Sequence, residues 1–249
     1  MRQQNLATGC EHIDIPLTSV VSLAACAFAG GGANVSPDPV AESVWERLGA
    51  DAARLSVLEL DAARERAATL DEHARRWAGQ HPNGTIVELG AGLSTRHARL
   101  ADLSVAYVAV DEPPLASLRE ELFVRPLPYV QVAMALEDRR WSRAVVAASR
   151  EVLVLVPDAW VDLHHEDVVA TAVALSAELP SGTVIIAAYG PKAQLRVARP
   201  DARHPSVEVR IDHGFGAVES IAIPRLRWLE VPRPEDGADL PALALLHTA

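Results

Sequence analysis

Apolar and polar positions follow two kinds of spacing along this chain. After Gly84, short apolar runs alternate with stretches whose apolar residues recur every three or four positions. Such runs predict strands, and the stretches between them predict helices. The predicted strands are Thr85 to Leu89, Val105 to Asp111, Tyr129 to Ala133, Val152 to Val156 and Thr183 to Tyr189. The alternation predicts an α/β fold with a doubly wound, mostly parallel sheet, and ligands of such folds lie at the carboxyl ends of the strands.

The residues before and after this region have other patterns. Up to residue 82 the spacing is helical, and predicted helices span Leu17 to Phe28, a segment opened by Ser36-Pro37-Asp38-Pro39, and Leu60 to Trp77. Four later apolar runs predict antiparallel strands at the sheet edge. These runs are Val207 to Ile211, Val218 to Ile223, Leu226 to Val231 and Leu240 to Leu246. We therefore predict an N-terminal helical cap, 1–82, and a core, 83–249, that form one structural unit.

A glycine-rich turn follows the first predicted strand. The strand stops at Glu88, Gly90 and Gly92 form the turn, and a helical pattern begins after them. Glycine permits a tight turn and close approach of a ligand to the backbone. Asp111 lies about 20 residues further on at the end of the next strand, where a carboxylate can accept both ribose hydroxyls. This spacing predicts a nucleotide site and counts against an ordinary turn with a chance acid.

Two residues favour one class of nucleotide. Thr95 stands where a dinucleotide site has its third glycine, and Glu88 places a negative charge beside the position of a pyrophosphate. A nicotinamide oxidoreductase is therefore disfavoured. S-adenosyl-L-methionine has no phosphate and carries a sulfonium and an ammonium, so Glu88 and Asp111 suit it electrostatically. We predict this cofactor, bound in part by Glu88, Gly90, Gly92 and Asp111.

Composition excludes several other functions. The chain has 249 residues, 49% hydrophobic content and a net charge of -10, and Lys192 is its one lysine, so no basic stripe exists to follow nucleic acid. Cys10 and Cys26 lack metal-ligand spacing, which predicts no metal site and fits a reducing cytoplasm. The uncharged stretch 15–37 suggests a signal peptide or a membrane segment. Acidic residues precede the stretch and glycines interrupt its apolar run, which counts against both. We expect a cytoplasmic enzyme of a small-molecule substrate, and the sequence leaves the oligomeric state open, a homo-oligomer included.

Three segments resemble a known family. IVELGAGLSTRHARL, YVAVDEPPLASLREELF and VAMALEDRRW are similar to the leucine carboxyl methyltransferase family, and most to its tetracenomycin-type branch of bacterial polyketide O-methyltransferases. The resemblance covers about Asp38 to Gly190 by order and spacing of segments. It implies a Rossmann-like class I methyltransferase fold and O-methylation of a small hydroxylated or carboxylated metabolite in bacterial secondary metabolism.

The resemblance also implies roles for residues outside the glycine turn. Arg66 matches the arginine that binds the methionine carboxylate of the cofactor, although Ala67 replaces the usual threonine after it. Glu137 or Asp138 resembles the acid that contacts the adenine amino group. In the family, the N-terminal helical segment covers the cofactor. The alternative for all three side chains is a solvated helix or loop surface.

The sequence departs from the family after the fourth strand. A Glu-Gly pair and a tyrosine are replaced by the segment 157–162, followed by His164 and His165, and the usual aspartate of the glycine turn is Ser94. Methyl transfer to oxygen needs an in-line approach and a base that removes a proton. The candidate bases are His164, His165, Asp158 and Asp162, and histidine is favoured because its pKa is near neutrality. The altered segment supports an alternative to the methyltransferase, a protein that binds the cofactor without methylating, either a cyclase-like catalyst or an accessory protein.

Overall fold

A computed structural model describes most of residues 15–189 and the backbone of four later strands. The described residues are 15–28, 38–50, 55–136, 138, 140–149, 151–159, 171, 175, 177–180, 183–189, 208–211, 218–222, 226–230 and 242–248. The chain divides into two compact units. The first unit is Met1–Asn83 with Gly90–Leu136, and the second unit is Gly84–Leu89 with Glu137–Ala249. The division into a cap, 1–82, and a core, 83–249, stays a prediction.

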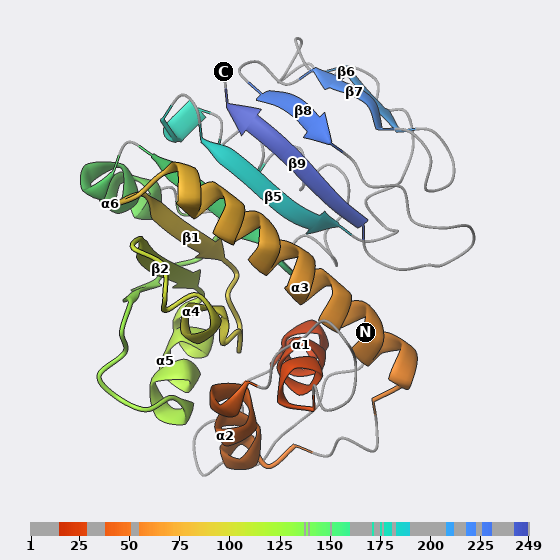
Figure 1. The fold of residues 1–249 in the computed structure, drawn as a ribbon, viewed down its shortest axis with the longest axis vertical. Helices are drawn as coiled ribbons and strands as arrows, with labels where there is room; N and C mark the ends of the chain where they lie inside the picture. The colour runs from red at the N-terminus through yellow and green to blue at the C-terminus, as the bar shows by residue number, and fades with distance from the viewer. Residues whose placement is uncertain are drawn as a thin grey trace. The chain divides into compact units, whose positions relative to one another are not determined.

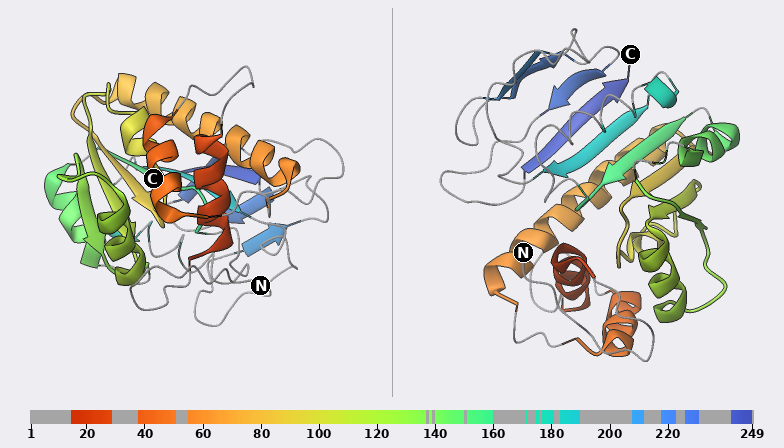
Figure 2. Two further views of the ribbon diagram at one scale, coloured as in Figure 1. Left: turned by 90° about the horizontal axis from the view of Figure 1, so that it is seen from below. Right: turned by 180° about the vertical axis from the view of Figure 1, so that it is seen from behind.

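The first unit begins with three helices whose starts and ends are set by the sequence. They are α1 (Leu17–Ala27), α2 (Pro39–Leu48) and α3 (Val57–Gln80). Asp38 accepts the N–H of Ala41 at 2.9 Å at the start of α2, and Ser56 and Glu59 form a capping box at the start of α3. These contacts satisfy N–H groups that have no partner within the helix. Helix α1 packs against both α2 and α3 (Figure 1 and Figure 2).

Apolar packing holds α1 in place. Eight of its 11 residues are buried and none carries a charge, so burial outweighs any contribution from capping, which α1 lacks at its first residue. Its core neighbours include Trp45 of α2, Leu93 of the turn after β1, and Phe123. Each large apolar side chain buried in this way contributes about 2 to 3 kcal/mol.

The first unit also contains a strand-helix-strand element. It consists of β2 (Ala106–Asp111), α5 (Pro113–Leu122) and β3 (Val130–Ala133), and the short helix α4 (Arg96–Arg99) precedes it. Strands β2 and β3 pair in parallel, with Asp111 opposite Ala133, and α5 packs on both strands. Asp111 is therefore the last residue of a strand whose next element is a helix, as nucleotide-binding folds require.

The second unit contains a five-stranded sheet. Its order is β1 (Thr85–Leu89), β4 (Val152–Val156), β5 (Val184–Tyr189), β9 (Ala242–Thr248) and β8 (Leu226–Glu230). Strands β1, β4 and β5 are parallel, whereas β9 and β8 are antiparallel to their neighbours. Every residue of β1 and β4 is buried, which explains their continuous apolar runs. Helix α6 (Arg140–Ala148) contacts β1.

These elements confirm the predicted α/β class. All five predicted parallel strands are present with small differences at their first residues, and α3 extends beyond its predicted bounds. Strands β8 and β9 confirm the antiparallel addition, while β6 (Glu208–Ile211) and β7 (Val218–Ala222) form a separate two-stranded sheet. Within the described part of the chain, every helix is too short or too polar to cross a bilayer.

Candidate functional site

The loop that follows β1, residues 90–95, is here termed the glycine loop. Gly90 and Gly92 have φ angles of 68° and 51°, a left-handed conformation that a β-carbon disfavours. The N–H of Gly90 donates to the carbonyl of Val110, and the N–H of Gly92 donates to the carboxylate of Asp111, both at 2.8 Å. The glycine loop is therefore held against the end of β2, which is the juxtaposition that the sequence spacing predicts.

Asp111 is an ionisable residue that is almost completely buried. It is 2% exposed, and its Oδ2 accepts the N–H of Gly92. Burial raises the pKa of Asp111 to about 7, against the opposing effects of Arg119 and of the Gly92 N–H. Perturbed carboxyl groups of this kind are concentrated at functional sites. The two oxygens of an ionised Asp111 are suited to accept hydrogen bonds from a diol.

Helix α1 lies directly over Gly92. A β-carbon on Gly92 would be 2.2 Å from Ser19 Oγ, closer than such atoms approach, and 3.0 Å from Ser19 Cβ, a tight contact. The missing side chain therefore makes room for α1 as well as permitting the turn.

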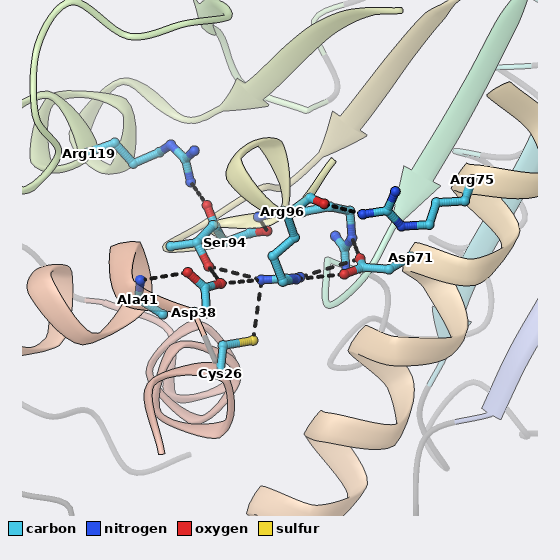
Figure 3. Close-up of polar contacts among 10 residues, drawn as sticks. Cys26, Asp38, Ala41, Asp71, Arg75, Ser94, Arg96 and Arg119 are labelled. Atoms are coloured by element: carbon cyan, nitrogen blue, oxygen red, sulfur yellow. Dashed lines mark hydrogen bonds and ion pairs between the residues drawn. The ribbon is translucent and has the colours of Figure 1, made fainter. Parts of the chain in front are cut away.

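An ion-pair network connects α2 and α3 with the glycine loop and α4 (Figure 3). Asp38 accepts the hydroxyl of Thr95 at 2.6 Å and Nη1 of Arg99 at 2.8 Å. Asp71 of α3 accepts Nε of Arg99 and Nε of Arg96, each at 2.6 Å. Burial raises the pKa of Asp71, but Arg96 and Arg99 outweigh it and hold that pKa below its ordinary value. Two acids thus face two arginines, so the buried charges are balanced.

Three other predicted cofactor residues lie at described positions, and their roles stay predictions. Arg66 is half-buried on α3, and Glu88 is fully buried in β1, which belongs to the second unit. Asp138 accepts Nε of Arg140 at 2.9 and 3.0 Å at the start of α6. These hydrogen bonds lower the pKa of Asp138 to about 2, so its carboxylate is ionised at neutral pH.

The predicted catalytic residues are only partly described. Asp158 is half-buried two residues after β4, at the strand end where the sequence places it. Asp162, His164 and His165, together with the cofactor candidate Glu137, lie outside the described residues. The identity of the base therefore stays a prediction.

Sequence reasoning missed the buried charges around the glycine loop. Arg119 follows Leu115 by four positions and precedes Leu122 by three, which places it on the apolar face of α5. A charged residue at a core-facing position was the signal that could have identified it. Asp71 had no comparable signal, because it stands in a helix rich in arginine and glutamate.

Comparison with known proteins shows a similarity in sequence and a similarity in fold. The chain is 26% identical over 198 residues, 78% of its own length and 73% of the other's, to the tetracenomycin polyketide synthesis O-methyltransferase TcmP of Streptomyces glaucescens. The crystal structure of a candidate methyltransferase from Thermobifida fusca YX matches with a TM-score of 0.53 and 17% identity, covering 92% of this chain and 94% of that one. No family profile matches the chain. The sequence match confirms the resemblance that the glycine-loop segments indicate, and the structural match confirms the fold.

Proposed function

Because this chain is a homologue of an O-methyltransferase and has a Rossmann-like methyltransferase fold, we propose that it is an S-adenosyl-L-methionine-dependent O-methyltransferase. The observation that carries the proposal is the hydrogen bond from the Gly92 N–H to the Asp111 carboxylate. This bond joins a glycine turn that a ligand can approach closely to an acid at a strand end. Nucleotide-binding folds hold a ribose at this place.

The described residues of the first unit fit this cofactor. Asp111 would accept its ribose hydroxyls, and the glycine loop would lie against it without a side chain at Gly90 or Gly92. Arg66 would bind its carboxylate. The role of Glu88, which belongs to the second unit, stays the prediction made from the sequence. When bound, S-adenosyl-L-methionine supplies an electrophilic methyl group on a sulfonium. The residues of the protein would bind the cofactor, orient it toward the acceptor and exclude water.

The acceptor is proposed to be a small hydroxylated or carboxylated metabolite. Support comes from the relative, whose name places it in polyketide synthesis. Positioning an acceptor oxygen in line with the methyl group supplies much of the rate, and a base is needed only for a group that is not already ionised. His164 is the favoured base, with Asp158 and Asp162 as the alternatives, because imidazole titrates near neutral pH.

A second candidate function is supported by one observation. The segment 157–165 lacks the Glu-Gly pair and tyrosine of the resembled family. A protein that keeps Gly90, Gly92 and Asp111 but has an altered acceptor side could hold the cofactor as a cyclase-like catalyst or as an accessory protein. A nicotinamide oxidoreductase is disfavoured by Thr95, which replaces the third glycine of a dinucleotide loop.

Two measurements separate these functions. Calorimetry with S-adenosylmethionine, S-adenosylhomocysteine and NAD, each titrated alone, should show binding of the first two and none of NAD. Incubation of S-adenosylmethionine with phenolic and carboxylic polyketide-like acceptors should then yield S-adenosylhomocysteine. Cofactor binding with no product from any acceptor supports the non-methylating protein, and binding of NAD alone overturns both.

The base is tested by a pair of neighbouring variants. His164→Ala should lower turnover by about 100-fold while S-adenosylhomocysteine affinity is retained, because a base acts on the acceptor. His165→Ala is measured alongside it, because His165 is the neighbouring candidate base, and a loss of turnover in that variant alone would assign the base to His165. Equal turnover in His164→Ala and wild type would indicate catalysis by positioning alone, which an acceptor that ionises readily permits.

A further inference from the structure

Arg119 is a buried cation whose contacts point to a function other than packing. It is 0% exposed on α5, and its described hydrogen bonds go to two carbonyls and a phenol rather than to a carboxylate. Within the described residues its Nε has no hydrogen-bond partner. Burying a charge without an ion pair is costly, and an apolar side chain of similar length would fill the same space. The position therefore uses the charge and the donors of arginine.

The donors of Arg119 hold the same glycine loop that contacts Asp111. Nη1 donates to the carbonyl of Gly92 at 2.7 Å and to the carbonyl of Ser94 at 3.0 Å. The N–H of the same Gly92 donates to Asp111. The N–H of Gly92 is thus bound by the carboxyl group of Asp111, and its carbonyl by the guanidinium of Arg119. Together these contacts select the left-handed conformation in which the Gly92 N–H faces Asp111.

The guanidinium is itself fixed by aromatic residues. Nη2 donates to the hydroxyl of Tyr129 at 2.7 Å, and the guanidinium carbon lies 4.6 Å from the ring centre of Phe123 and 5.3 Å from that of Tyr129. His97 contacts Tyr129 with ring centres 4.4 Å apart and ring planes tilted by 49°. Burial, aided by the charge of Arg119, lowers the pKa of His97 to about 4, so His97 adds no second positive charge at neutral pH. A cation held by two rings keeps its orientation.

We propose that Arg119 is a positioning residue of the cofactor site, which fixes the glycine loop in the conformation that faces Asp111. This inference rests on the proposed function and adds a residue to it. The charged groups around Asp111 are Arg119, which favours its ionisation, and Glu112, which opposes it. Strand β3, whose Ala133 pairs with Asp111, and helix α1, whose Ser19 lies against Gly92, bring no charged side chain. Removing the charge of Arg119 therefore leaves Glu112 as the neighbouring charge and makes Asp111 harder to ionise.

The test compares variants that separate the charge of Arg119 from its hydrogen bonds. Arg119→Met removes both. Arg119→Lys and Tyr129→Phe keep the positive charge but remove some of the hydrogen bonds that the guanidinium makes or that hold it in place. S-adenosylhomocysteine affinity is measured by calorimetry from pH 6 to 9. In wild type it should rise with pH around a midpoint near 7, because the ionised carboxylate is the better acceptor. Arg119→Met should move this midpoint upward by about one pH value and weaken binding at pH 7 about tenfold.

The charge-retaining variants should behave differently. Arg119→Lys and Tyr129→Phe should bind about fivefold more weakly at every pH, with the midpoint of wild type. Arg47→Met is the matched control, since Arg47 donates to the carbonyl of Leu122 on α5 without contacting the glycine loop. It should leave the midpoint unchanged. A merely structural role of Arg119 would weaken binding without moving the midpoint.

The outcomes that overturn the inference are distinct from those that overturn the function. Wild-type protein that binds no S-adenosylhomocysteine at any pH contradicts the proposed function. The pH dependence of urea unfolding then still reports on Arg119, because the stability loss caused by ionising Asp111 should extend to higher pH in Arg119→Met. An unchanged midpoint in folded Arg119→Met overturns the inference. If Arg119→Met does not fold, wild-type affinity in both Arg119→Lys and Tyr129→Phe overturns it instead.

Discussion

Replacing Asp111 by asparagine should have opposite effects on stability and on cofactor binding. The carboxyl has an ordinary pKa of 3.8, and burial raises its pKa to about 7 in the folded protein. Between these pH values the unfolded chain has released the proton while the folded chain retains it. Rising pH therefore favours the unfolded state, and wild type loses stability from about pH 4 until the loss is complete just above pH 7.

The size of the loss follows from the two pKa values. A pKa difference of one unit corresponds to about 1.36 kcal/mol of free energy. The difference between the ordinary pKa of 3.8 and the folded-state pKa of about 7 therefore corresponds to about 4 kcal/mol of stability. An asparagine keeps an oxygen that can accept the Gly92 N–H, but it buries an amide NH₂ whose lost hydration costs about 1 to 3 kcal/mol. At pH 8, Asp111→Asn should therefore be about 1 to 3 kcal/mol more stable than wild type, and at pH 5 this advantage should be absent.

The assay is urea unfolding followed by tryptophan fluorescence from pH 5 to 8.5. Asp61→Asn is the control, because the Asp61 side chain is 62% exposed, and its effect should be small at every pH. The same Asp111→Asn protein should bind S-adenosylhomocysteine at least about tenfold more weakly, since an amide presents one acceptor where a carboxylate presents two. A stability difference between Asp111→Asn and wild type that does not grow between pH 5 and 8 would refute the argument that burial raises the pKa of Asp111.

Three further predictions concern the cap helices. Gly92→Ala should destabilise the protein by about 1 to 3 kcal/mol in urea unfolding. The loss of stability should be smaller in a Ser19→Gly background, where only the backbone strain at position 92 is left. Equal losses in both backgrounds would show that Ser19 is not the clashing group. Asp38→Asn should cost about 2 to 4 kcal/mol because it leaves Arg99 buried with one ion-pair partner fewer, and an unchanged unfolding midpoint would contradict this. Arg66→Lys should weaken S-adenosylhomocysteine binding severalfold in calorimetry if Arg66 binds the cofactor carboxylate, and wild-type affinity would exclude that contact.

The sequence by itself determined the elements and the pairing of the glycine loop with Asp111. Strands β1 and β4 are recognisable as continuous apolar runs because they are buried on both faces, and α2 because Asp38 and Pro39 start it and Gly49 ends it. The Gly92–Asp111 contact was predictable because one turn and one strand fix the distance between a loop and the next strand end.

Only the tertiary structure decided which distant side chains complete the surroundings of that loop. Arg99 meets Asp38 across 61 positions of sequence, and Arg119 reaches the Gly92 carbonyl across 27. Periodicity shows that a helix has an inner face, but it does not show which neighbour that face will meet. The same limit explains why Gly92 could be read as room for a ligand, when in this structure Ser19 of α1 lies there. Contacts between elements depend on how whole helices pack, and that is a property of the assembled core rather than of any local pattern.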